Sequence, residues 1–269
     1  MRNLKLTIAY DGTRHVGWQL QAAGESVQGL LEQALTKIEG APVVVHGAGR
    51  TDAGVHALGQ VASASVESAH DANTFVRALN ATLPEDVRVL SVQDVPADFH
   101  ARFSATSKTY RYVLRLSAIA TPFERLYAWQ LAETLDLMAM RRAAHALVGT
   151  HDFATFQSAG TDVSSTVRTI SRSEVLVYPG VTWDVTGKTG QPRLPASPRG
   201  STDALIAYEV SGNGFLRHMV RAIVGTLVEV GRGRRAPGTI GPLLAGGNRA
   251  AAGPTAPAHG LFLVAVVYD

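Results

Sequence analysis

The stretch HGAGRTDAGVH, residues 46–56, sets one carboxylate and one guanidinium among three glycines. Glycine permits backbone conformations and close approaches that a Cβ would prevent, so such a loop can present Asp52 to a large ligand. Arg50 and Asp52 are two positions apart, and in an extended segment both project to the same side. A plain tight turn needs one or two glycines and does not call for the Arg-Thr-Asp insert. We therefore interpret this stretch as a functional loop with Asp52 as nucleophile or base.

Apolar periodicity around the loop predicts a β-α-β-β-α-β order in the first part of the chain. Strands are expected over residues 43–46 and 59–66, on either side of the loop, and over residues 4–10 and 87–92. One helix is expected over residues 26–38, with Ser26 as its N-cap, and a second over residues 73–83, where Pro84 stops it. This order is that of the split βαβ, or ferredoxin-like, arrangement.

The second part of the chain repeats the order. Strands are expected over residues 108–116, 169–177, 205–211 and 261–268, and helices over residues 135–148 and from Phe215 to about Glu229. The sequence therefore predicts an α+β protein with two domains, residues 1–105 and 106–269. Residues 179–203 are rich in Pro, Gly, Ser and Thr and are expected to form a long excursion of the second domain.

The composition is that of an ordinary globular protein of 269 residues, 46% hydrophobic and 17% charged. The chain has no cysteine, which excludes disulfides, cysteine nucleophiles and thiolate metal sites and agrees with a reducing compartment. No apolar run is long enough to cross a bilayer. We expect a cytoplasmic protein without a membrane partner.

The net charge of +3 does not by itself identify a nucleic-acid binder, but arginine greatly outnumbers lysine. Arginine stacks on bases and grips phosphates bidentately, which suits RNA contact. A GC-rich genome would give the same bias, so this observation leaves both explanations open.

Two distant segments contain candidate partners of Asp52. Basic and aromatic residues alternate over residues 99–112, where a ring such as that of Tyr110 could stack on a base for about 1–3 kcal/mol. A plain strand with Tyr110 and Tyr112 on one face would look the same. In the second segment, Arg217 and Arg221 lie one turn apart beside an apolar helical stripe, and exposed positions would account for both.

Several of these motifs resemble the TruA family of tRNA pseudouridine synthases, and the resemblance covers essentially the whole chain. The motif GRTDAGVH is followed at the family's spacing by GQV at residues 59–61. The motifs HARFSA at residues 100–105, YRY at residues 110–112 and HMVR at residues 218–221 also match, as does the closing strand from Gly260.

The resemblance implies isomerisation of uridine to pseudouridine at positions 38, 39 and 40 of the tRNA anticodon arm. By the matching motifs, Asp52 is the nucleophile, Arg221 keeps it ionised and oriented, and Tyr110 packs against the target base and assists proton loss. The expected substrate-binding residues also include Arg50, which would occupy or hold the space that the base vacates, and Leu261, which would be an apolar wall of the pocket. His100 and Arg102 complete this set. For Leu261, a position in plain sheet core fits equally well.

The resemblance further implies two domains side by side in one continuous, mostly antiparallel sheet with a central active-site cleft, and a homodimer bridged by one tRNA. Residues 10–12 and 17–19 resemble an N-terminal loop that contacts RNA. His15 stands there where an aromatic residue is usual, and Leu20 stands where an arginine is usual.

Neither a cofactor nor a metal is expected. The isomerisation is redox-neutral and consumes no energy carrier, and the histidines form no H-E-x-x-H or comparable cluster.

The rival interpretation is a non-catalytic RNA-binding module. Such a module needs only basic and aromatic residues, whereas an aspartate in a glycine-framed loop would repel RNA. An unrelated acid-base hydrolase would require paired carboxylates, which this loop lacks. The sequence leaves open whether Asp52 attacks C1′ of the ribose or C6 of the base.

Overall fold

The structure, a computed structural model, describes residues 1–119, 121–158, 160, 163–178 and 204–269. The chain forms two compact units, the first comprising Met1–Lys108 and Phe262–Asp269 and the second Thr109–Leu261. The expected excursion over residues 179–203 lies outside the described residues. The domain limits 1–105 and 106–269 stay a prediction.

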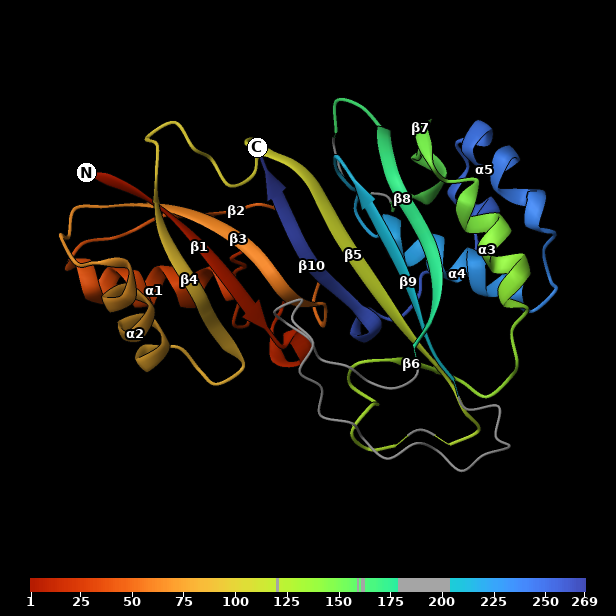
Figure 1. Cartoon of the computed structure of the whole chain (residues 1–269), viewed down its shortest axis with the longest axis horizontal. Coiled ribbons are helices and arrows are strands. Elements are labelled where there is room, and N and C mark those ends of the chain that lie inside the picture. Colours follow the sequence, from red (N-terminus) through yellow and green to blue (C-terminus); the bar gives the residue numbers. More distant parts are fainter. Residues whose placement is uncertain (120, 159, 161–162, 179–203) are drawn as a thin grey trace. The chain divides into compact units, whose positions relative to one another are not determined.

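The first unit has the element order β-α-β-β-α-β, with a further strand from the end of the chain (Figure 1). Its sheet order is β4-β1-β3-β10, and β2 also pairs with β3. All of these pairings are antiparallel except that of β10 with β3. The elements are β1 (Arg2–Tyr10), a 3-10 turn (Gly12–Arg14), α1 (Val27–Glu39), β2 (Val45–Gly47), β3 (His56–Val66), α2 (Ala72–Thr82), β4 (Val87–Val95) and β10 (Leu261–Tyr268).

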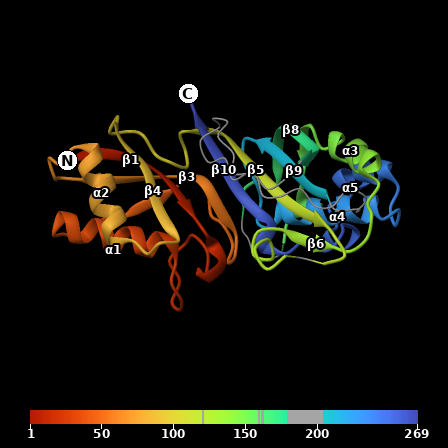
Figure 2. The ribbon, with the colours of Figure 1, turned by 60° about the horizontal axis from the view of Figure 1, so that its bottom comes forward.

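Alternation along β1 decides which face of this sheet becomes the core. Leu4, Leu6 and Ile8 are fully buried, and α1 and α2 lie on one face of the sheet (Figure 2). Helix α1 begins after Ser26, whose side chain accepts a hydrogen bond from the Gly29 N–H, so the predicted cap is confirmed.

The second unit has the sheet order β5-β9-β8-β7, with β6 parallel to β5. Helix α4 is the most buried helix of this unit and lies behind β8 and β9 in Figure 1. The elements are β5 (Ala105–Leu116), β6 (Trp129–Leu131), α3 (Leu137–His145), β7 (Gly149–Asp152), β8 (Val167–Tyr178), β9 (Ala204–Gly212), α4 (Met219–Gly231) and α5 (Ile240–Gly246), with 3-10 turns at Ala154–Phe156, Pro237–Thr239, Arg249–Ala251 and Ala258–Gly260.

The predicted α+β class with a mostly antiparallel sheet is confirmed. The predicted start of the last long helix at Phe215 is wrong, because α4 begins at Met219. His218 precedes it with a φ of 60°, in the left-handed region that non-glycine residues rarely adopt. The backbone therefore changes direction there, and no helix extends back to Phe215. Within the described part of the chain, no helix is both long and apolar enough to cross a membrane.

Helix α4 is crossed at close range by the segment that leads to β10. A Cβ built on Gly225 would lie 1.7 Å from the carbonyl oxygen of Pro254, whereas one built on Gly246 in α5 would meet nothing within 4 Å. Only glycine at position 225 allows the backbone of Pro254 to lie this close.

We predict that Gly225→Ala lowers the free energy of unfolding by about 1–3 kcal/mol, because the added methyl group overlaps a backbone atom. The matched change Gly246→Ala should raise it by up to about 1 kcal/mol, since alanine favours helix over glycine where space is open. Urea titrations followed by circular dichroism measure both. Equal effects of the two substitutions would contradict this account of the crossing.

Candidate active site

The Asp52 loop connects β2 to β3 and is held at its centre by Thr51. The buried Thr51 hydroxyl lies 2.8 Å from the Tyr10 hydroxyl, and the Thr51 carbonyl accepts a hydrogen bond from the Trp18 N–H at 3.0 Å. Arg50 is exposed and Asp52 is partly buried. Thr51 is buried between them, and the expectation that Arg50 and Asp52 project to the same side stays a prediction.

Backbone from the N-terminal loop lies directly against the Asp52 loop. Gly17 pairs with Asp52 in an isolated antiparallel bridge, and a Cβ on Gly17 would lie 2.6 Å from the Thr51 carbonyl oxygen. A Cβ on Gly12 would lie 2.0 Å from the Val55 carbonyl oxygen. Glycine at both positions is what lets the two loops approach, and side chains there would push Asp52 out of place.

Both ends of the Asp52 loop are anchored as well. The Gln60 amide donates to the Gly49 carbonyl at 2.8 Å. At the other end, the Nδ1 atom of His56 accepts a hydrogen bond from the Gly12 N–H at 3.0 Å, and its ring stacks on Phe262 with centroids 4.7 Å apart. Asp52 is therefore presented by a loop whose backbone is fixed on three sides.

Tyr10 is buried beneath this loop, and burial raises its pKa to about 12, opposed by its hydrogen bonds to Thr51 and Gln60. Desolvation disfavours the phenolate, so the phenol keeps its proton at neutral pH. The hydroxyl remains available to support Thr51 throughout the physiological range.

His100 and Arg102 lie in the segment between β4 and β5, also in the first unit. His100 is half-buried, and burial lowers its pKa, helped by the neighbouring His46. Arg102 is exposed, with its guanidinium 5.5 Å from the ring of Phe103.

Tyr110 lies on β5 in the second unit and is almost fully buried. Its ring meets Phe215 edge to face, with centroids 4.9 Å apart, which fixes the tyrosine orientation. Leu261 is also buried, at the start of β10.

Arg221 occupies the first turn of α4. Its Nε–H donates to the Ala256 carbonyl at 2.7 Å, and the Ala256 N–H donates to the Arg221 carbonyl at 3.1 Å. Burial raises the pKa of nearby Tyr112, and the positive charge of Arg221 opposes that shift. The Tyr112 hydroxyl donates to the Pro257 carbonyl at 2.8 Å. The segment around residues 256–257 thus positions Arg221, while Arg217 stays exposed.

The predicted site residues are distributed over both units. Asp52 and Arg50 share one loop, His100 and Arg102 follow β4 in the same unit, and Tyr110, Arg221 and Leu261 belong to the second unit. The sequence interpretation did not identify the residues that hold these groups in place: Trp18 at Thr51, Phe215 at Tyr110 and Ala256 at Arg221. For Trp18, the sequence did contain a signal: the glycines at positions 12 and 17 indicate a close backbone approach in this loop.

The N-terminal loop is partly buried and partly exposed, and Thr13 and Arg14 are among its exposed residues. His15 and Trp18 are buried, whereas Leu20 is exposed. Among the described residues, no group of three or more His, Asp or Glu side chains is placed to hold a metal ion.

Comparison with known proteins identifies the family of the chain. A family model described as tRNA pseudouridine synthase matches residues 6–104 and 143–269. The chain belongs to this family of isomerases, so the resemblance and the enzyme class predicted from the sequence are confirmed.

Individual relatives carry the narrower name tRNA pseudouridine synthase A. One from Maridesulfovibrio salexigens is 45% identical over all of this chain and 91% of its own length. Others are from Solidesulfovibrio magneticus, 47% identical over all of this chain and 92% of its own length, and Citrifermentans bemidjiense, 41% identical over all of this chain and 98% of its own length.

Gly17→Ala should lower turnover of uridine in tRNA by tenfold or more. The added Cβ would overlap the Thr51 carbonyl and displace Asp52, and a misplacement of about 1 Å can cost on the order of 100-fold. Gly40→Ala is the matched control, because Gly40 also has a positive φ, of 70°, but open space around it. Gly40→Ala should cost about 1 kcal/mol of stability for its positive φ, and Gly17→Ala should cost more because its Cβ also meets a backbone atom. Equal turnover by the two variants would overturn the role given to Gly17.

Tyr10→Phe should flatten the loss of stability at high pH. Tyrosine ionises near pH 10 in the unfolded chain and near pH 12 at Tyr10 in the folded protein. The folded state therefore keeps a proton that the unfolded state loses, and stability falls as pH rises through that window. In Tyr10→Phe, the free energy of unfolding should be about 1 kcal/mol lower at pH 7 because a hydrogen bond is lost. Above pH 10 it should then fall less steeply than in wild type, by about 1.4 kcal/mol per pH unit. Urea midpoints at pH 7 and pH 11 test this, and a difference from wild type that does not change with pH would contradict it.

Proposed function

We propose that this protein converts uridine to pseudouridine at positions 38, 39 and 40 of the tRNA anticodon arm, with Asp52 as the nucleophile. The observation that carries this proposal is the Asp52 loop, in which a partly exposed carboxylate and an exposed guanidinium project from a backbone fixed by Tyr10 and Trp18. Because the chain belongs to a family of tRNA-modifying isomerases, the alternative of a non-catalytic RNA-binding module is no longer needed.

The reaction rearranges one bond without a net change in composition. The N1–C1′ glycosidic bond breaks, the uracil rotates, and C5 bonds to C1′. The proton on C5 is lost and N1 gains one, so no redox cofactor is required. Asp52 starts the sequence by attack on C1′ of the ribose or on C6 of the base, and both routes need an ionised carboxylate.

The target base must leave the helical stack before any of these steps, at a cost of a few kcal/mol. The exposed side chain of Arg50 is suited to occupy or hold the vacated space. We assign Tyr110 to stacking on the base and to proton loss at C5, Arg221 to catalysis, and Leu261, His100 and Arg102 to substrate binding. The rigid support of Tyr110 by Phe215 and of Arg221 by Ala256 favours these assignments.

We also propose that both units are ferredoxin-like domains and that the protein acts as a cytoplasmic homodimer on tRNA. The β1-α1-β2-β3-α2-β4 order of the first unit supports the domain assignment. Light scattering on the purified protein, with and without tRNA, tests the dimer.

Asp52→Asn and Asp52→Ala should abolish tritium release from a tRNA transcript whose uridines carry tritium at C5. Removal of a nucleophile should cost at least about a thousandfold in turnover. Both variants should bind the transcript as tightly as wild type or more tightly, because one negative charge facing a polyanion is lost.

Asp94→Asn is the matched control, since it removes the same charge from an exposed pair with Arg2 in the same unit. Its release rate should stay within about twofold of wild type. Full release by Asp52→Ala would remove Asp52 from the chemistry. Transcripts that retain a single uridine at position 38, 39 or 40 test the three positions, and release only from uridines elsewhere would exclude them.

A further inference from the structure

Three rings stack on the face of the first unit's sheet opposite α1 and α2. The centroids of His46 and His100 are 5.0 Å apart with planes tilted by 28°. The centroids of His100 and Phe103 are 4.4 Å apart with planes tilted by 34°. We call His46, His100 and Phe103 the ring stack.

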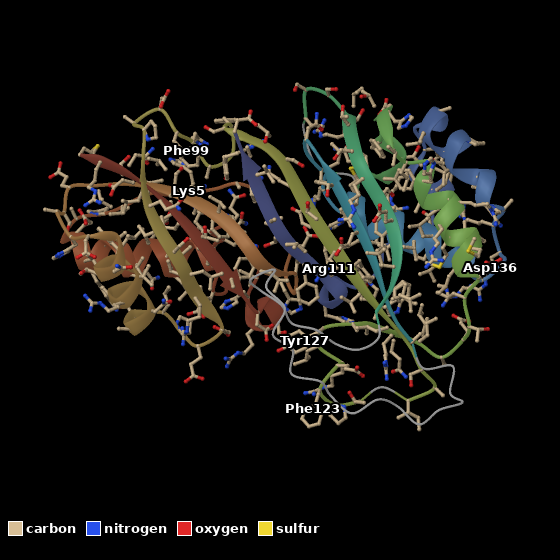
Figure 3. The ribbon with its side chains drawn as sticks, in the orientation of Figure 1. Lys5, Phe99, Arg111, Phe123, Tyr127 and Asp136 are labelled. Carbon is tan, nitrogen blue, oxygen red and sulfur yellow. The ribbon has the colours of Figure 1, made fainter. Side chains whose placement is uncertain are left out.

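The segment that carries two of these rings is anchored to the sheet beneath it. Ala101 is fully buried, its N–H donates to the Ser63 hydroxyl at 3.1 Å, and its carbonyl accepts from the Tyr268 hydroxyl at 2.7 Å. Earlier in the segment, the ammonium group of Lys5 lies 6.0 Å from the Phe99 ring, and the two side chains are seen close together in Figure 3. The rings are therefore held in place before any ligand arrives.

Backbone contacts fix the orientation of the central ring. The Nδ1 atom of His100 accepts hydrogen bonds from the N–H groups of Arg102 at 3.1 Å and Phe103 at 3.4 Å. This nitrogen is thus an acceptor, and the neutral imidazole agrees with the lowered pKa of His100. A neutral ring stacks between His46 and Phe103 without charge repulsion.

The outer ring of the stack, that of Phe103, is largely exposed to solvent. Phe103 is 76% exposed, although its backbone is fixed, so its ring contributes little to the core. Its neighbours are the imidazole of His100 and the guanidinium of Arg102, 5.5 Å from the ring. A flat apolar face beside a cation suits a nucleotide, whose base stacks and whose phosphate is neutralised, better than an apolar protein surface.

We propose that the ring stack binds a second, unpaired base of the substrate RNA, with Arg102 against its phosphate. This base is distinct from the uridine presented to Asp52, and the inference rests on the proposed action on tRNA. His46 belongs to β2, which leads directly into the Asp52 loop. A base stacked there would fix the RNA strand next to the reacting nucleotide.

The test uses anticodon stem-loop RNAs with 2-aminopurine at one unpaired position at a time, bound to the full chain carrying Asp52→Asn so that no turnover occurs. One position should show fluorescence quenching on binding. Adding Phe103→Ala should remove this quenching and weaken RNA binding by about 5- to 150-fold, the range for loss of one stacked base. Phe103→Trp should preserve both quenching and affinity.

Phe123→Ala is the matched control, because Phe123 is 82% exposed but lies outside the ring stack. It should leave quenching and affinity unchanged. Wild-type affinity and quenching in Phe103→Ala would overturn the proposal. A change in the oligomer mass of Phe103→Ala at unchanged RNA affinity would also overturn it, by assigning the ring to a protein contact.

Tritium release by the chain with Asp52 intact separates this proposal from the proposed function. Phe103-dependent quenching without any release would retain the ring stack and reject the isomerisation. Normal release with no dependence of binding on Phe103 would do the reverse.

Discussion

The close approach of two backbone segments is the constraint on which the Asp52 loop depends. Residues 12–17 lie against residues 51–55 at distances that exclude a Cβ, and the bridge between Gly17 and Asp52 is formed by main chain. Main-chain contacts of this kind fix the backbone of Asp52 by groups that a change of side chain elsewhere does not remove. A site built in this way has a rigid support that does not depend on the ligand.

The same division between support and presentation recurs at the other candidate residues. Phe215 orients Tyr110, Ala256 orients Arg221, and buried Ala101 anchors the turn that exposes Phe103. In each case the orientation of a candidate functional side chain is set by a neighbouring ring, by a backbone carbonyl or by a buried residue. Preorganised groups of this kind lose little entropy when the substrate binds.

Local sequence signals were sufficient for much of the fold. The order of elements in the first unit follows from periodicity, and Ser26 was recognisable as a cap because capping involves only neighbouring residues. The start of α4 was not predictable, because apolar spacing continues through residues 215–218 while the backbone of His218 turns into the left-handed region. Contacts between distant segments, such as Trp18 with Thr51 or Phe262 with His56, depend on tertiary packing that periodicity does not encode.

The pairing of β10 with β3 joins the last strand of the sequence to an early one within one unit. Phe262 and Leu263 lie beside His56 and Ala57 at the point where the Asp52 loop joins β3. A ribosome that has released only residues 1–108 has therefore not yet supplied the strand that covers this edge. The edge stays open until residues 262–268 emerge, and the Asp52 loop reaches its final support late in synthesis. A nascent chain cut short in the second unit would thus keep an intact GRTDAGVH motif and lack the strand on which its last residue rests.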